Sequence, residues 1–172
     1  MRVLEIRLFG QVRLHFGDTP VKLMNPGRTV PLLVFLLLHR GQPLKRKFLA
    51  RTLWPDESDE SALGSLRRNL FRIEKSLPPI SGRWLQTDVL SAQWADSAPT
   101  FVDTDAFTNA CQSDETLESA IAPYSGDLAE GLNDEWILGA RERYRSEHLD
   151  ALMRLINRAR SNLEHGKAIA FA

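Results

Sequence analysis

Residues 44–77 constrain the fold of this chain most strongly, because their apolar side chains from Leu63 onward recur at helical spacing. Intervals of three and four residues place five of them on one side of an α-helix, and that side must pack against a core. The five are Leu63, Leu66, Leu70, Ile73 and Leu77. At about 100° per residue, the opposite face collects Ser61, Gly64, Ser65, Arg68, Arg72 and Lys75, with Arg67 and Asn69 on its flanks. We expect this face to point outward and to offer many hydrogen-bond donors.

Two interpretations of that face remain open. A basic helix face is most often simply solvated. Short or bidentate donors, in place of alternating Glu and Lys, favour contact with nucleic acid instead. We therefore expect Arg68 and Arg72 to contact base edges. Ser61, Ser65 and Lys75 are expected on bases or phosphates, while Arg67 and Asn69 position the helix.

The segment before this helix completes a predicted helix-turn-helix. Residues 45–53 predict a helix with Phe48, Leu49 and Leu53 directed inward. Its first turn holds Lys45, Arg46 and Lys47, the unfavourable end of the helix dipole for cations. Phosphate contact and simple solvation both explain these cations. The acidic run 56–60 is better explained as a helix cap and first turn than as a metal site, since no matching ligand cluster accompanies it.

Strands flank these helices. Alternation predicts strands over residues 3–9 and 11–16, a turn at 17–20 and a return strand over 21–23. A core helix capped by Thr29 is expected to run to His39. After a stop at residues 78–82, strands at 84–86 and 92–94 predict a hairpin, whose nearest cation is Arg83. Arg83 or backbone donors would make any phosphate contact there.

Charge divides the chain into two halves. The whole sequence is neutral, yet residues 1–83 hold 15 Lys and Arg against 7 Asp and Glu, and the remainder has the reverse balance. This pattern is typical of a basic binding domain followed by an acidic one. We place the boundary between residues 97 and 98. Residues 98–172 predict helices only: one capped by Asp103 and running to Cys111, one over 114–122, and a long one from Asp134 to Gly166 with a further helix beginning after it.

The order of strands, three helices and a hairpin resembles the OmpR-type winged helix of response-regulator output domains. The patterns R-x-x-x-L-L-x-x-L-L-L-H-x-G-x-P from Arg28, L-W-P-D from Leu53 and S-L-R-x-x-L-x-R-I from Ser65 resemble the antibiotic-regulatory, or SARP-type, activator family. Residues 124–128, Trp136 and residues 141–143 resemble the bacterial transcriptional activation domain that follows it there. The resemblance implies an α+β winged helix over residues 1–97 and an all-α, tetratricopeptide-like domain over 98–172. It also implies that this second domain is truncated at its C-terminus, because the family's is longer.

The resemblance implies a sequence-specific transcriptional activator with double-stranded DNA as its partner. It further implies direct-repeat promoter sites, side-by-side binding of two copies and recruitment of RNA polymerase. The alternative is a protein-interaction or scaffold module, which a large exposed apolar patch would favour. Apolar surface at Leu163 and Phe171 suggests a homodimer contact.

Other classes fit the sequence poorly. The four histidines lack nucleophile or acid companions at useful spacing, and no Gly-rich phosphate loop occurs, so we expect neither catalysis nor a cofactor. His148 and Cys111 are expected as packing residues. One cysteine, no signal peptide and a longest apolar run over residues 30–38, too short for a bilayer span, indicate a cytoplasmic protein without membrane contact.

Overall fold

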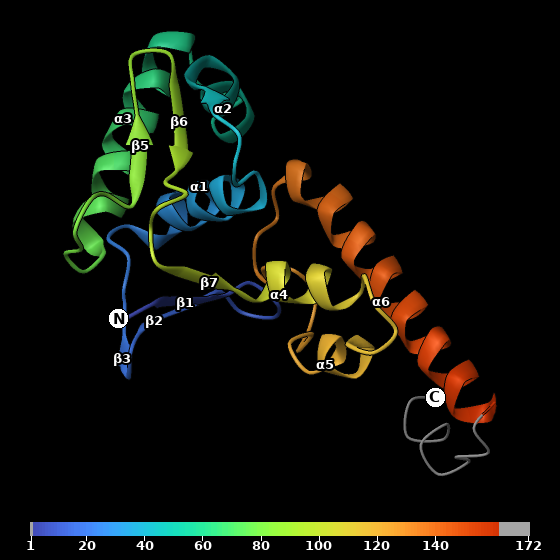
Figure 1. Ribbon diagram of the computed structural model, residues 1–172. Coiled ribbons are helices and arrows are strands. Elements are labelled where there is room, and N and C mark those ends of the chain that lie inside the picture. Colours follow the sequence, from blue (N-terminus) through green and yellow to red (C-terminus); the bar gives the residue numbers. More distant parts are fainter. Residues whose placement is uncertain (1, 162–172) are drawn as a thin grey trace. The chain divides into compact units, whose positions relative to one another are not determined.

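The computed structural model describes residues 2–161, apart from the side chain of Ala120. This part of the chain forms both strands and helices (Figure 1), in agreement with a sheet-bearing N-terminal part followed by a helical one. The strands are β1 Leu4–Arg7, β2 Arg13–Phe16, β3 Thr19–Pro20, β4 Leu44–Lys45, β5 Leu85–Thr87, β6 Ser91–Trp94 and β7 Thr100–Val102. The helices are α1 Pro26–Leu38, α2 Arg46–Leu53, α3 Asp59–Ser76, α4 Asp103–Ala110, α5 Leu117–Ile121 and α6 Glu135–Ser161. The expected helix end at Gly166, the helix after it, Leu163 and Phe171 lie outside the described residues.

The chain divides into two compact units. The first comprises residues 1–5 and 13–100, and the second comprises residues 6–12 and 101–172. The expected boundary after residue 97 differs from this division, because the short segment 6–12 belongs to the second unit. One sheet has the strand order β3-β2-β1-β7, and a second has the order β4-β6-β5.

The first unit is built around α1. Its side chains from Leu32 to Leu37 are buried almost all round, as expected of a central core helix. Helix α1 packs against α3 and β6. In the second sheet β6 is central, pairing Leu44 with Ala92 on one side and Leu85 with Trp94 on the other.

The predicted start of α1, with Thr29 as the cap, was wrong. The helix begins at Pro26, with Asn25 in the cap position, so Thr29 lies inside the first turn. Proline suits this first position because its fixed φ matches a helix and its missing N–H has no acceptor there. The Thr29 hydroxyl donates to the Met24 and Asn25 carbonyls, which explains how it is fully buried without an unpaired donor.

Two further local expectations need correction. The return strand is Thr19–Pro20 instead of 21–23, because the chain reverses tightly and pairs Phe16 with Thr19. Phe48 is 51% exposed, since α2 turns Leu49, Ala50 and Leu53 toward the interior. The predicted hairpin at 84–94 is confirmed, as strands β5 and β6.

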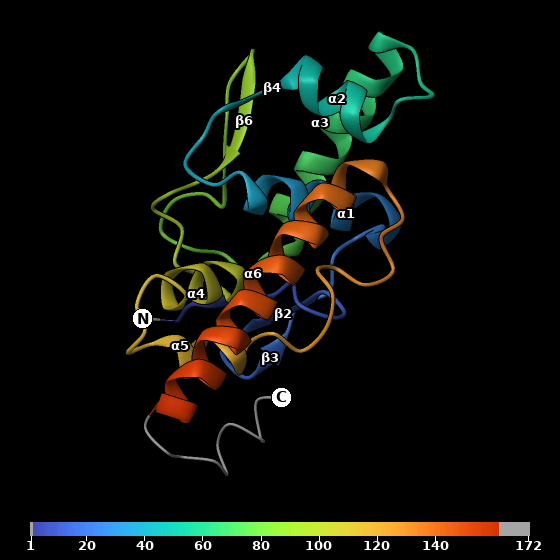
Figure 2. The same cartoon turned by 90° about the vertical axis from the view of Figure 1, so that its right-hand side faces the viewer.

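The second unit contains α4, α5 and α6, with α5 packing against both other helices (Figure 2). It also contains strand residues Phe101 and Val102, where only helices were expected. Asp103 does not cap α4, whose cap position is Val102. The helix from 114 to 122 is reduced to Leu117–Ile121.

Aromatic rings form the centre of the second unit. The Phe9 ring meets those of Phe107, Tyr124 and Tyr144 at centroid distances of 4.8–5.4 Å. His148 stacks on Tyr124 with ring centroids 4.0 Å apart, and burial lowers the pKa of the imidazole. The expected packing role of His148 is therefore confirmed. Among the helices within residues 2–161, none combines the length and hydrophobicity that a membrane crossing requires.

Candidate nucleic-acid interface

Helix α3 is the longest element of the first unit, with 18 residues and a length of about 27 Å. Ser58 occupies its cap position and accepts a hydrogen bond from the Ser61 amide, while Asp59 and Glu60 fill the first turn. Lys75 lies in its last turn. These charges complement the helix dipole at both ends, and the cap with its acidic first turn was expected from the sequence.

The buried face of α3 differs from the predicted stripe. Leu66, Leu70 and Ile73 are buried as expected, but Leu63 is only partly buried and its place is taken by Ala62. Two expected contact residues also turn inward, since Ser65 is 7% and Asn69 3% exposed. Apolar spacing alone misplaces the stripe because a small hydroxyl and an amide can be buried once their hydrogen bonds are made.

Both inward-facing polar side chains form hydrogen bonds within the protein. The Ser65 hydroxyl donates to the Glu57 carboxylate at 3.0 Å. The Asn69 amide donates to the Ser65 carbonyl at 2.9 Å, and the Asn69 Oδ1 accepts from Arg72 at 3.2 Å. Arg72 itself is half-buried. Direct base contact by Ser65 and Asn69 would require these hydrogen bonds to break, so the structure points to a supporting position for both.

The outward face consists of Arg67, Arg68, Phe71 and Lys75, all exposed. The Lys75 ammonium lies 5.7 Å from the centre of the Phe71 ring, and Arg68 donates to the Ser65 hydroxyl at 3.0 Å. Within the described residues, none of these three cations forms an ion pair. The exposed ring of Phe71 was not expected, because the predicted apolar stripe does not include it.

Ser61 is exposed near the start of α3, but its hydroxyl donates to the Glu57 carboxylate at 2.7 Å. That hydrogen bond lowers the pKa of Glu57, with smaller contributions from Ser65 and from the charges of Arg28 and Arg68. An ionised acid therefore lies beside this end of the outward face.

The three cations before α2 occupy different positions. Lys45 is the last residue of β4, and only Arg46 and Lys47 belong to the helix. Lys45 and Lys47 are exposed, whereas Arg46 is half-buried against the hairpin. The Arg46 amide donates to the Leu90 carbonyl at 2.8 Å and its Nε to the Ser91 carbonyl at 3.4 Å.

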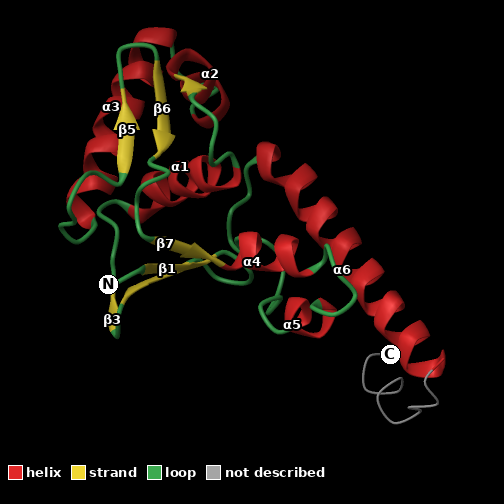
Figure 3. Ribbon diagram, viewed as in Figure 1, coloured by secondary structure: helices red, strands yellow, loops and turns green. Residues whose placement is uncertain are grey.

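The β5–β6 hairpin lies alongside α3 (Figure 3). At its tip, the Asp88 carboxylate accepts hydrogen bonds from the Leu90 amide at 2.6 Å and from the Ser91 amide at 2.7 Å. These hydrogen bonds, led by one from the Ser91 hydroxyl, lower the pKa of Asp88. Val89 and Leu90 project from this turn and are 90% and 77% exposed. The sequence analysis did not single out Val89 and Leu90.

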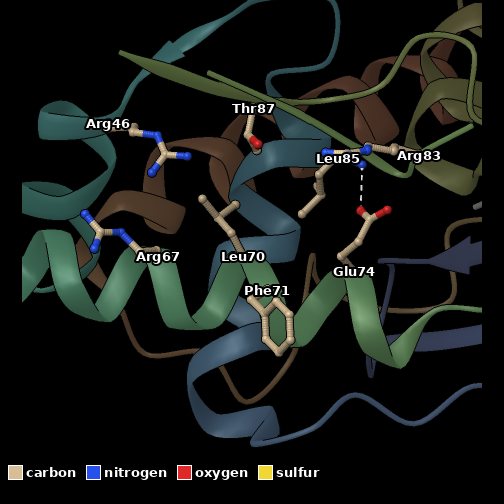
Figure 4. Close-up of a pocket in the computed structure, with 8 residues that line it drawn as sticks. All are labelled: Arg46, Arg67, Leu70, Phe71, Glu74, Arg83, Leu85 and Thr87. Carbon is tan, nitrogen blue, oxygen red and sulfur yellow. Dashed lines mark hydrogen bonds between the residues drawn. The ribbon is translucent and has the colours of Figure 1, made fainter. Parts of the chain in front are cut away.

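A hollow runs between α3 and the hairpin, and Figure 4 shows its lining. We call it the α3–hairpin hollow. It is lined by Arg46, Arg67, Leu70, Phe71, Glu74, Arg83, Leu85 and Thr87. Arg46 and Arg67 lie at one end and Arg83 at the other, with the apolar side chains between them (Figure 4). The structure thus brings together three cations that the sequence places in separate segments.

A second hollow adjoins the hairpin tip. Its lining combines apolar Leu63, Val89 and Leu90 with the cations Lys45, Arg46, Lys47 and Arg67. In the part of the chain with described coordinates, no three His, Cys, Asp or Glu side chains gather as a metal site. The first unit therefore offers a basic and partly apolar surface formed by α2, α3 and the hairpin.

Comparisons with known proteins show similarity in structure but not in sequence. No protein-family model and no curated protein matches the sequence. The structure resembles that of EmbR from Mycobacterium tuberculosis, solved in complex with a low-affinity phosphopeptide, with a TM-score of 0.70 and 16% identity. The match covers 99% of this chain and 55% of that one, so the chain spans about half the length of EmbR. At this identity the similarity shows that the chain shares the fold of EmbR.

Proposed function

We propose that this chain is a sequence-specific DNA-binding transcriptional regulator. In this proposal residues 1–97 are a winged helix, α3 is its recognition helix and the β5–β6 hairpin is its wing. Residues 98–172 are a tetratricopeptide-like activation domain. The observation that carries the proposal is the outward face of α3, where Arg67, Arg68 and Lys75 are exposed without an ion pair among the described residues. A helix fits the DNA major groove, and guanidinium groups contact both guanine edges and phosphates.

The remaining parts of the proposal rest on the family resemblance and on the fold shared with EmbR. They are activation from direct-repeat promoter sites, recruitment of RNA polymerase, pairing of two copies and a cytoplasmic location. Lys45, Lys47 and Arg83 are proposed phosphate contacts, with Ser61 and Arg72 at the edge of the interface. Ser65 and Asn69 hold the arginines in place.

The test begins with selection of bound duplexes from a random DNA library by the purified protein. The Arg67→Ala, Arg68→Ala double variant is then titrated against the enriched duplex by fluorescence anisotropy. We expect affinity to fall at least about tenfold and the salt dependence to become shallower, since each lost phosphate contact lowers the slope by about one. A matched control, Arg143→Ala with Arg160→Ala, removes two exposed cations from the acidic second unit. Equal affinities for the two double variants would refute the assignment of α3.

A second candidate function is a protein-interaction module. This function is favoured by the exposure of Val89 and Leu90, which line one hollow together with Leu63. Apolar surface at a hairpin tip can bind a partner protein. The same selection distinguishes the two functions. A module of this kind would enrich no duplex and would show no salt-dependent binding to DNA.

A further inference from the structure

The hollow beside the hairpin tip, which we call the hairpin-tip hollow, combines apolar and basic side chains. Its cavity measures about 320 Å³, at the small end of the range for ligand pockets. This volume suits a few side chains of a short chain segment and not a whole domain. No acidic residue among residues 2–161 belongs to the lining, which consists of Lys45, Arg46, Lys47, Leu63, Arg67, Val89 and Leu90.

The apolar part of the lining is exposed to solvent. Val89 and Leu90 are exposed at the turn of the hairpin, and Leu63 beside them on α3 is only partly buried. The turn is held by hydrogen bonds from the Leu90 and Ser91 amides to the Asp88 carboxylate, so the two aliphatic side chains are not needed to shape it. Covering them with an apolar group would remove this surface from water and favour binding. The ligand is therefore expected to carry at least one bulky apolar group.

The walls of the hairpin-tip hollow are joined by the backbone. Lys45 in β4 pairs with Ser91 in β6, and the Arg46 amide donates to the Leu90 carbonyl at 2.8 Å. The Arg46 Nε also donates to the Ser91 carbonyl, at 3.4 Å. The start of α2 and the hairpin tip are thus tied together before any ligand arrives. A preformed site avoids part of the ordering cost of binding.

The basic part of the lining lacks acidic partners. Asp88 in the hairpin turn offsets some of the charge of Arg46. The other three cations, Lys45, Lys47 and Arg67, are exposed, and among the described residues none of them forms a salt bridge. Excess positive charge of this kind favours an anionic partner through electrostatic complementarity. The ligand is therefore expected to carry acidic groups beside its apolar one.

A peptide with Asp or Glu on both sides of a Leu, Phe or Trp supplies both kinds of group. The DNA backbone supplies anionic phosphates, but it has no aliphatic or aromatic side chain to cover the apolar lining. We propose that the hairpin-tip hollow binds a short acidic segment of a partner protein. The bulky side chain of the segment packs on Leu63, Val89 and Leu90, and its carboxylates pair with the three exposed cations.

This binding has a consequence for DNA. Lys45 and Lys47 are also the proposed phosphate contacts, and Arg67 lies on the proposed recognition helix. An acidic segment in the hairpin-tip hollow would therefore compete with DNA for the same cations, and the partner protein would release the chain from its duplex. The peptide contact itself does not depend on the proposed function, whereas the competition rests on it.

The experiment starts from a random peptide library displayed on phage. The library is selected on the full chain and depleted on the Val89→Ser, Leu90→Ser double variant. We expect the enriched peptides to share acidic residues on both sides of a bulky apolar residue. One enriched peptide is labelled and titrated with each protein by fluorescence anisotropy. Two altered peptides accompany it, one with every acid replaced by its amide and one with the bulky residue replaced by Ser.

The apolar and the charged contacts are then tested separately. Val89→Ser with Leu90→Ser should weaken peptide binding at least about tenfold, and the Ser-containing peptide should lose little more on this variant. Lys45→Ala with Lys47→Ala should also weaken binding at least about tenfold at low salt, and the amide peptide should lose less on this variant than on the unsubstituted protein.

The matched control is Arg143→Ala with Arg160→Ala, which removes two exposed cations from the second unit. This variant should bind the peptide as the unsubstituted protein does, and thermal unfolding verifies that all variants are folded. The unlabelled peptide should also displace the selected duplex from the unsubstituted protein. The Val89→Ser, Leu90→Ser variant should hold the duplex and resist this displacement.

Several results would overturn the inference. They are a selection that enriches no peptide, enriched peptides without acidic residues, and equal peptide affinity in the hairpin-tip variant and the unsubstituted protein. Loss of the selected duplex instead of the peptide in Val89→Ser, Leu90→Ser would assign the tip to DNA. A peptide that binds while the duplex stays bound would contradict the competition. If a peptide binds as expected but no duplex can be selected, the hollow is confirmed and the proposed DNA function is refuted.

Discussion

The Ser65 hydroxyl donates a hydrogen bond to the Glu57 carboxylate, 3.0 Å from Oε2, and accepts one from Arg68 at 3.0 Å. Ser65 therefore links the exposed guanidinium of α3 to the acid before the helix. The link holds Arg68 close to the helix surface, and the carboxylate offsets part of the positive charge there. Glu57 therefore weakens the electrostatic attraction of Arg68 for a phosphate at this end of α3.

Replacement of Glu57 by Gln is expected to raise DNA affinity by about twofold at low salt, because it removes one charge that repels phosphates about 10 Å away in water. Gln retains an oxygen that can accept from Ser61 and Ser65, so the local structure should persist. The gain should fade at high salt through screening. Fluorescence anisotropy with the selected duplex measures it. Glu135→Gln, which removes an exposed acid at the start of α6, is the control, and an equal effect of both variants would contradict the prediction.

Asp103 is 2% exposed and accepts hydrogen bonds from the Leu8 amide at 2.8 and 2.9 Å and from the Phe9 amide at 3.1 Å. Asp103→Ala should lower the free energy of unfolding by about 3 kcal/mol, because two buried amides lose their acceptor. Urea unfolding followed by circular dichroism measures the change. Asp150→Ala, an exposed position in α6, should be nearly neutral. Similar losses in the two variants would show that the buried carboxylate is not the cause.

The same residue predicts a pH dependence. Burial raises the pKa of Asp103 above its ordinary value of 3.8, although its backbone hydrogen bonds act in the opposite direction. The folded state then binds the proton more tightly than the unfolded state. Stability relative to Asp103→Asn should therefore rise as the pH falls through the raised pKa, and level off below about 3.8. A relative stability that falls over this range would mean that the hydrogen bonds outweigh burial.

Arg141 joins α6 to the preceding loop. Its guanidinium donates to the carbonyls of Leu128 at 2.8 Å, Ala129 at 2.7 Å and Leu132 at 2.7 Å. Arg141→Lys should cost about 2 kcal/mol of unfolding free energy, since an ammonium cannot reach three carbonyls in this planar arrangement. Urea unfolding measures the cost. Arg143→Lys, at an exposed position two residues on, is the control, and equal losses would contradict the role of Arg141.

The sequence predicted those helices and strands that depend on residues close together in the chain. Helix α3 with its acidic start, the core helix α1 and the hairpin follow from periodicity, dipole charges and turn residues within one segment. Predictions were wrong where long-range hydrogen bonds determine the position of a residue. Asp103 pairs with amides 94 and 95 residues away, so no local pattern could distinguish this role from a helix cap.

The same limit applies to the candidate site: its local features were predictable from the sequence, and its tertiary contacts were not. The exposed arginines Arg67 and Arg68 follow from the sequence of α3, but the inward turn of Ser65 and Asn69 depends on partners that spacing does not show. The grouping of Arg46, Arg67 and Arg83 around one hollow depends on how the hairpin folds back beside the helix. These arrangements are tertiary, and residue periodicity carries no information on them.

The hairpin tip supplies a last prediction. Val89 and Leu90 are exposed, and their turn is held by the Asp88 hydrogen bonds instead of by burial. Replacing both with Ser should therefore change the free energy of unfolding by less than about 0.5 kcal/mol. If the tip serves a partner protein, this double variant should lose that partner while retaining full affinity for the selected duplex. The contrast is Leu85→Ala. Leu85 is 3% exposed, and loss of its side chain should cost about 3 kcal/mol in the same urea titration. A Ser variant as unstable as Leu85→Ala would show that the tip packs against the protein, and would remove the reason to treat it as a contact surface.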